Sequence, residues 1–231
     1  MSRFGFSTEP SSGGDYLPVT KYDARAGRMF RVDRTQDASG NYVTDQVDIT
    51  GSFKAVFDFE NVETGWIYFA AGAAPDFRLV PMGSMLPDRP TPNHKNGIRF
   101  MMKLSQACGG DKQIREIAGT SKAFLSAVEA VFEEYDGARK DNPGKLPVVA
   151  MDGATPIKSG TGQKTSTNYV PKFRITGWAP RGDLVFTPKN GEREPVRQGG
   201  APQTPPSTGG TVAPPPAAQK QPEPELEDEF G

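Results

Sequence analysis

The sequence is poor in the side chains that most enzymes and metal sites require. It contains one cysteine, Cys108, and one histidine, His94, among 231 residues. A single cysteine excludes an intrachain disulfide and is typical of a reducing compartment. A zinc site needs several His or Cys ligands, and a Ser–His or Cys–His nucleophile system would have to use His94, which we expect to be a solvated loop residue. We therefore predict a protein that is not an enzyme and holds no metal or cofactor.

Long apolar runs are also missing from the sequence. No window approaches the length of a membrane-spanning helix, and the N-terminal residues lack the apolar core of a signal peptide. We expect a cytoplasmic protein that does not associate with a membrane.

The last part of the chain has few apolar residues and many prolines and glycines. We predict a disordered linker over 189–222, because such a composition cannot offset its ordering entropy by burial. Residues 223–231 contain five of the 28 acids of the chain and none of its 27 lysines and arginines. The net charge of −1 therefore conceals a mildly basic body and an acidic tail. Such a tail is typical of partner binding, and its predicted contact residues are Leu226, Glu227, Asp228, Glu229 and Phe230.

Residues 27–188 provide enough chain for one domain, preceded by a flexible N-terminal arm over 1–26. Alternation of apolar and polar residues predicts strands, and an apolar stripe after Ser121, a plausible N-cap, predicts a long helix. The predicted strands are 28–34, 47–59, 66–71, 146–151, 169–178 and the closing segment 184–186, with a further short strand at 77–80 in the loop 72–97; the predicted helices are 98–107 and one from about 121 to 140; a polar loop is expected over 152–168.

This element order predicts a mainly β protein with inserted helices. Three strands, a helical segment and further strands follow one another, which is the order of an OB-fold, a five-stranded Greek-key barrel with its helix between strands three and four. We therefore expect an OB-fold core followed by a disordered C-terminal tail.

Motifs for phosphate binding and for acid chemistry are incomplete. The segment 160–165 has glycines and Lys164, but a P-loop needs Gly directly before Lys and a helix after it, and here Gln163 and a strand take those places. Glu129, Glu133 and Glu134 lie opposite the apolar stripe of the helix and are expected to be solvated. A hydrolase or nuclease acting through acids would need a ligand cluster that the spacing does not show.

Aromatic and basic residues lie close together on several predicted strands. Nonspecific binding of single-stranded nucleic acid uses this combination, because aromatic rings stack on unpaired bases and cations contact phosphates. We predict that the residues contacting single-stranded DNA are Lys54, Trp66, Tyr68, Arg99, Lys103, Lys158, Lys164, Tyr169, Lys172, Arg174 and Trp178. A barrel also needs aromatic residues inside, so Trp66, Tyr68 and Trp178 remain open between core and binding surface.

The segment 172–178, the linker and the tail residues 225–230 together resemble single-stranded DNA-binding proteins, above all those encoded by phages. The resemblance implies a protein that coats single strands in replication, recombination or repair, in the host cytoplasm if phage-encoded. It implies an acidic tail that recruits polymerase, helicase or primase and competes with DNA for the basic groove. The chain differs from the bacterial tails in that Gly231 follows Phe230.

Two questions remain open on sequence grounds. The alternative function is an interaction or assembly adaptor without nucleic-acid binding, in which all of the aromatic residues would be core. The sequence does not decide between DNA and RNA, and it leaves a homo-oligomer open.

Overall fold

The computed structural model describes residues 17–71, 74–159 and 165–187. The described chain is mainly β, with one long helix. Its strands are β1 (Val19–Asp23), β2 (Arg28–Gln36), β3 (Tyr42–Asp48), β4 (Lys54–Phe57), β5 (Glu63–Tyr68), β6 (Asp76–Pro81), β7 (Lys95–Leu104), β8 (Ile114–Gly119), β9 (Lys145–Ser159) and β10 (Ser166–Pro180). Its helices are α1 (Gln106–Gly109) and α2 (Lys122–Ala138), with short 3-10 turns at Thr50–Ser52 and Arg139–Asp141.

All of these strands belong to one mixed sheet. The order along the sheet is β10-β9-β4-β7-β8-β1-β2-β3, and β5 and β6 branch from β7. The pairing of β1 with β8 is parallel, and the other ladders are antiparallel. The sheet curls so that the start of β10 approaches the end of β1, where the amide of Tyr169 donates to the carbonyl of Ala24 at 2.7 Å. No ladder joins these two strands within the described residues, so the sheet remains open.

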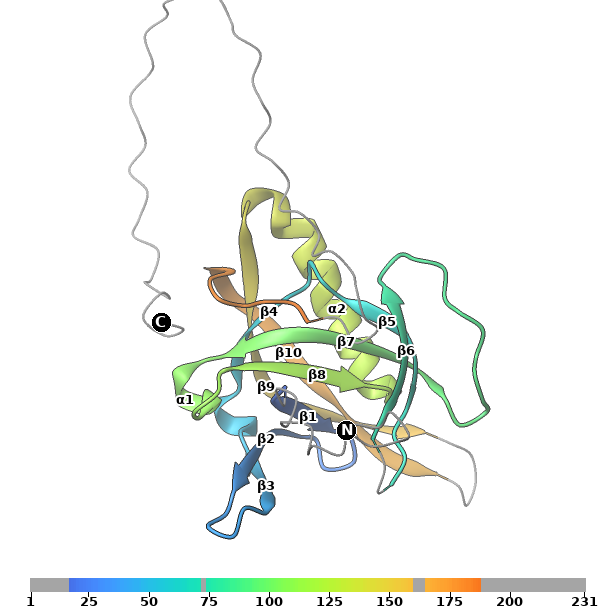
Figure 1. Ribbon diagram of the computed structural model, residues 1–231. Helices are drawn as coiled ribbons and strands as arrows, with labels where there is room; N and C mark the ends of the chain where they lie inside the picture. The colour runs from blue at the N-terminus through green and yellow to red at the C-terminus, as the bar shows by residue number, and fades with distance from the viewer. Residues whose placement is uncertain (1–16, 72–73, 160–164, 188–231) are drawn as a thin grey trace, which may run out of the picture.

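The helix α2 packs its apolar stripe on the concave side of this sheet (Figure 1). Phe124, Val128 and Val131 are buried there with strand residues such as Phe57. The predicted N-cap is confirmed, because the hydroxyl of Ser121 accepts a hydrogen bond from the amide of Phe124 at 3.2 Å. The helix glutamates are exposed, as predicted. Within the described part of the chain, no helix has both the length and the apolarity that crossing a membrane requires.

A second, smaller core lies on the other side of β4, β7 and β9. It contains Val56, Met101, Val148 and Leu184. The prediction of a closing strand over 184–186 is wrong, because the segment 181–187 contains no strand. This segment, which we call the strap, instead crosses this side of the sheet. Arg181 holds the start of the strap by two hydrogen bonds of 2.8 Å to the buried carboxylate of Asp58. This arrangement raises the pKa of Arg181 above its usual value, chiefly through the hydrogen bond to Asp58.

The prediction of a helix over 98–107 is wrong, because most of this segment belongs to β7. β7 is central in the sheet and is buried on both faces. Such a strand has a continuous apolar run instead of alternation, and a run of this kind is not distinguished from a buried helix by periodicity.

Three other boundaries also differ from the sequence prediction. Much of the expected loop 152–168 belongs to strands, because β9 extends to Ser159 and β10 begins at Ser166. The expected strand 47–59 is divided between β3 and β4 by the 3-10 turn. The expected N-terminal arm 1–26 includes β1, which inserts between β8 and β2.

Candidate nucleic-acid interface

Two of the predicted aromatic residues lie together on the hairpin of β5 and β6. Trp66 and Tyr68 are two residues apart on β5 and therefore share one face, with Arg78 and Asp76 directly opposite them on β6. The other face of the hairpin holds the buried residue Ile67. Both aromatic rings remain partly exposed.

The hairpin depends on a glycine between its strands. The backbone of Gly65 has a φ of +155°, and a side chain there would run into the carbonyl group of Arg78. Close approach of β6 therefore requires glycine at this position.

The loop that joins β6 to β7 folds over Trp66. Its indole Nε1 donates to the carbonyl of Pro87 at 2.7 Å, and the guanidinium of Arg89 lies 5.4 Å from the ring centre. Arg89 in turn donates to the carbonyls of His94 at 2.8 Å and Pro92 at 2.5 Å. The loop thus places a cation beside the most polarisable ring of the hairpin.

His94 pins this loop to the hairpin. The expectation that His94 is solvated is wrong, since this residue is only 3% exposed. Its Nδ1 lies 2.8 Å from the hydroxyl of Thr91, and its Nε2 lies 3.2 Å from the carboxylate of Asp76 on β6. The ring centre is 5.6 Å from that of Tyr68. A buried imidazole needs partners for both nitrogens, and here the two partners come from the loop and the hairpin.

A second group of predicted residues lies on β4 and β10. Lys54 is opposite Ala150 of β9, which is opposite Arg174 of β10, so the two cations share a face of the sheet. Lys172 is exposed on the same face, two residues before Arg174. Arg174 binds the carboxylate of Asp152 with distances of 2.6 and 3.2 Å. These hydrogen bonds lower the pKa of Asp152 and raise that of Arg174.

The predicted aromatic residues of β10 do not join these cations. Trp178 packs on the α2 side, with its ring 5.9 Å from that of Tyr135. The register of β10 shifts between Ile175 and Gly177, and such a bulge reverses the alternation of side chains. Tyr169 is held at the point where β10 meets β1, because its carbonyl accepts a hydrogen bond from the hydroxyl of Tyr22 at 2.8 Å. Burial raises the pKa of Tyr22 to about 12, with a smaller contribution from Asp23.

Two predicted phosphate contacts on β7 are occupied by the protein itself. Arg99 is fully buried and donates to Glu63 at 2.6 Å and to Glu116 at 2.9 Å, so its assignment to a DNA-binding surface is corrected. Its third bond, of 2.7 Å, goes to the carbonyl of Thr187 in the strap. Lys103 is 11% exposed and pairs with Asp183 of the strap at 2.9 Å, which lowers the pKa of Asp183 mainly through this hydrogen bond.

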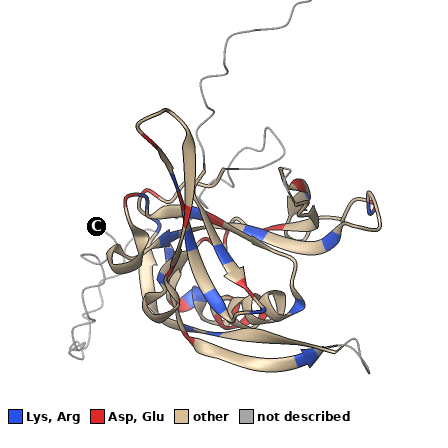
Figure 2. Cartoon of the chain, turned by 90° about the horizontal axis from the view of Figure 1, so that it is seen from below, with Lys and Arg blue, Asp and Glu red and all other residues tan. Residues whose placement is uncertain are grey.

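Of the remaining predicted residues, only Lys158 belongs to the part of the chain that the structure describes. Lys158 is exposed near the end of β9. Lys164 and the tail residues Leu226, Glu227, Asp228, Glu229 and Phe230 lie outside the described residues. Figure 2 shows lysine and arginine segments interspersed with aspartate and glutamate segments along the strands. Binding of an anion would therefore depend on local groups of cations.

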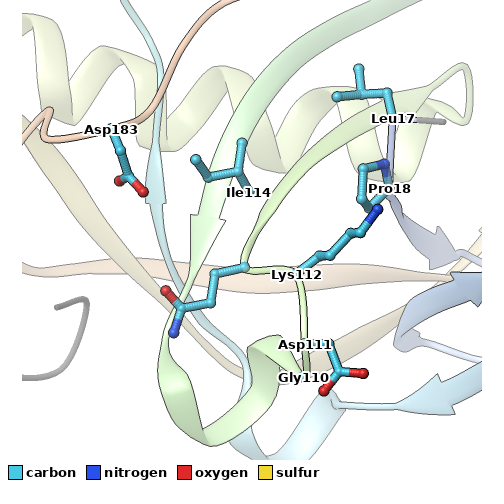
Figure 3. Close-up of a pocket in the computed structure, with 8 residues that line it drawn as sticks. Leu17, Pro18, Gly110, Asp111, Lys112, Ile114 and Asp183 are labelled. Carbon is cyan, nitrogen blue, oxygen red and sulfur yellow. The ribbon is translucent and has the colours of Figure 1, made fainter. Parts of the chain in front are cut away.

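A hollow of about 540 Å³ lies apart from all of these residues. Leu17 and Pro18 line one side, the turn 110–114 lines another, and Asp183 borders it (Figure 3). It is open and its walls include the charged side chains of Asp111 and Lys112. None of the predicted contact residues lines it, so we do not assign it to the interface.

Sequence reasoning missed Arg78, Arg89 and the structural role of His94. The alternation in 77–80 indicated the strand that carries Arg78, but its pairing partner Trp66 becomes visible only in the folded sheet. Arg89 lies in a proline-rich loop, where periodicity gives no signal.

Comparisons with known proteins identify no relative of this chain. No family model, no curated protein and no solved structure matches it.

Proposed function

We propose that the chain binds single-stranded nucleic acid, in the first place DNA, and does so on an OB-type core. The support for the core comes from five strands, β4, β7, β8, β9 and β10, with α2 between the third and the fourth. The fourth strand, β9, lies beside the first, β4, and the spatial order 4-1-2-3 is that of a Greek key. β1, β2 and β3 then extend the sheet at β8.

The binding surface follows from this correspondence. OB-folds bind oligonucleotides with strands two and three and with the loops between strands one and two and between strands four and five. Here the first of these connections is the β5–β6 hairpin with its covering loop, and the second is the hairpin of β9 and β10. The first carries Trp66, Tyr68, Arg78 and Arg89, and the second carries Lys158 and Lys164. The outer side of strands two and three is covered by the strap, so the two connections provide the contacts.

The observation that carries the proposal is the placement of Trp66 and Tyr68 on one face, with Arg78 and Arg89 beside Trp66. Both residues are partly exposed, so the part of each ring that the loop leaves uncovered offers a stacking surface for an unpaired base. The guanidinium of Arg78, which is exposed and pairs with Asp76 at 3.0 Å, and that of Arg89 can contact the phosphates. Paired bases are inaccessible to rings on a strand, so single strands are favoured over duplex. The protein acts by coating the strand, without a chemical step.

The partners in this proposal follow from the resemblance of the tail. Residues 223–231 recruit replication proteins such as a polymerase, helicase or primase, and compete with DNA for the cations. Removing the residues after Gln221 is then expected to tighten DNA binding, most visibly at low salt, because the competing carboxylates are gone.

The chain offers a direct test because it contains two tryptophans. In a Trp178→Phe background, the fluorescence of Trp66 reports on the β5–β6 hairpin alone. Titration with oligo-dT at low salt is expected to quench this fluorescence, and a duplex of equal length is expected to quench it far less. The Trp66→Ala variant should bind oligo-dT with about 1–3 kcal/mol less free energy, measured by anisotropy of a labelled oligonucleotide.

Two matched controls separate stacking from general damage. Arg139, an exposed cation in the 3-10 turn directly after α2, is replaced by alanine alongside Arg89→Ala, and the Arg89 variant should lose more affinity. Phe69, which is 48% exposed on the opposite face of the hairpin, is replaced by alanine alongside Trp66→Ala. Absence of any oligo-dT binding at neutral pH and low salt would refute the proposal and favour the adaptor function.

A further inference from the structure

The ribbon formed by β2 and β3 carries different side chains on its two faces. β3 is the last strand of the sheet, and all seven of its residues are exposed. The register places Asp33 opposite Asp45 on one face and Arg34 opposite Thr44 on the other. Directly opposed residues share a face. Asp33 and Asp45 are therefore on the face opposite to that of Arg34 and Tyr42.

The arginine face holds an exposed aromatic ring with a cation on it. Tyr42 is 57% exposed, and it lies on the same face as Arg34, whose guanidinium is 4.1 Å from the ring centre. Lys21 of β1 is opposite Phe30 and adds a second exposed cation to this face. Farther along, Arg28 pairs with Asp48 at 2.7 Å, which leaves the face with a net positive charge.

The other face carries the acids Asp33 and Asp45. Asp33 is paired at 2.7 Å with both Arg31 and Arg115 on this side, and Asp45 is exposed beside it. The two arginines of this face are therefore engaged with an acid, and Arg34 and Lys21 make the Tyr42 face the one that attracts a polyanion.

We infer that the Tyr42–Arg34 face is a second contact site for an unpaired base and its phosphate. The inference extends the proposed function, since it assigns a single-stranded ligand to a surface separate from the β5–β6 hairpin. Tyr42 supplies the stacking surface, and Arg34 lies over the same ring. Lys21 lies about 20 Å farther along the ribbon and would contact a phosphate several nucleotides away. A duplex is a poor fit, because its bases are paired and stacked and leave no free face for the Tyr42 ring.

The separation of the two sites sets the length of ligand that shows the effect. Between β5 and β3 the path through β7, β8, β1 and β2 includes five strand spacings, or about 24 Å. The register also places Trp66 on the face of the sheet that carries Arg31, opposite to the face of Arg34 and Tyr42, so a ligand that reaches both sites must also pass around an edge of the sheet. An oligo-dT of about 6 nucleotides is expected to engage one site, and one of about 30 nucleotides is expected to engage both.

The test uses the full chain with Tyr42→Ala and Arg34→Ala, and Val43→Ala as the control. Val43 is 42% exposed on the acidic face of the same strand. The Tyr42 variant is expected to bind the longer oligonucleotide about fivefold or more weakly than the Val43 variant. Quenching of Trp66 by the shorter oligonucleotide, in the Trp178→Phe background, is expected to be unchanged.

Each other outcome has a defined meaning. Equal affinities of the Tyr42 and Val43 variants would overturn the inference and leave the hairpin site intact. Loss of duplex binding without loss of single-strand binding in the Tyr42 variant would also overturn the inference. A change in the mass of the Tyr42 variant in sedimentation would overturn it too, because this face would then be a contact between copies of the chain. A Tyr42 effect without Trp66 quenching would support the inference and refute the hairpin site. Absence of binding by the unaltered protein would remove both.

Discussion

Replacing Arg99 with methionine should destabilise the protein more than any surface substitution. Arg99 is fully buried, and its two carboxylate partners, Glu63 and Glu116, are 2% and 7% exposed at their side chains. The Oε1 atom of Glu63 already has no hydrogen-bond partner. Methionine fills a similar volume but removes the cation that contacts both buried carboxylates. Removing one partner from a buried ion pair costs about 3–5 kcal/mol.

The loss is measurable by urea unfolding, followed by tryptophan fluorescence and by circular dichroism. At about 2–4 °C per kcal/mol, a domain of this size should also melt roughly 6–20 °C lower. A second readout is local, since Arg99 also binds the carbonyl of Thr187. The strap should therefore become more susceptible to chymotrypsin at Phe186 before the domain unfolds.

A matched variant and a rescue decide whether the cause is the buried charge. Arg139→Met removes an exposed pair with Asp136 and should cost between about 0 and 1 kcal/mol. Replacing Glu63 and Glu116 with leucine in the Arg99→Met protein should recover most of the lost stability, because an apolar cluster replaces the buried acids. A cost for Arg99→Met no larger than that of Arg139→Met, or a failure of the rescue, would refute this account.

Three further perturbations test other parts of the fold. Tyr22→Phe should cost about 0.5–1.5 kcal/mol through the lost hydrogen bond to β10. Burial raises the pKa of Tyr22 to about 12 in the folded protein, whereas the pKa of an unfolded tyrosine is near 10. The stability that Tyr22 contributes is therefore complete below about pH 10 and is lost as the pH rises toward about 12. Unfolding curves measured across this alkaline range should show that the pH dependence disappears in the Tyr22→Phe variant. The hydrogen bonds from Thr50 lower the pKa of Asp48, so Asp48→Asn should remove part of the stability loss seen as pH falls below about 4, measured by acid unfolding. Ser121→Ala should cost about 0.5–2 kcal/mol in urea unfolding, whereas Ser126→Ala within the same helix should cost less.

The sequence was most informative where one face of an element is buried and the other is solvated. The stripe of α2 and its cap at Ser121 were predictable because a helix on the side of a sheet must be amphipathic. The strands β2 and β6, which lie away from the buried middle of the sheet, were predictable for the same reason. β7 was not, because a strand buried on both faces loses its alternation, and charged residues such as Arg99 can be buried there when the fold supplies partners from distant segments.

The candidate site was predictable only in part. The spacing of Trp66 and Tyr68 places them on one face of a strand, whatever the rest of the fold. The position of Trp178 depends on a bulge after Ile175, which changes the face without a local signal in the sequence. Glu63 and Glu116, which neutralise Arg99, are 36 and 17 residues away from it, and only the pairing of three strands brings them together.

The parallel pairing of β1 with β8 has a consequence for the order in which the chain can fold. Val19 pairs with Glu116, which is synthesised 97 positions later. At about 5–20 residues per second, the first three strands must wait roughly 5–20 seconds for the strand that receives them. During that interval they form at most a three-stranded meander that lacks the strands and the helix on which its apolar face packs in the folded protein. The carboxylate of Asp45 on the edge strand β3 then acts as a gatekeeper, because a charge at an open strand edge discourages pairing between nascent chains.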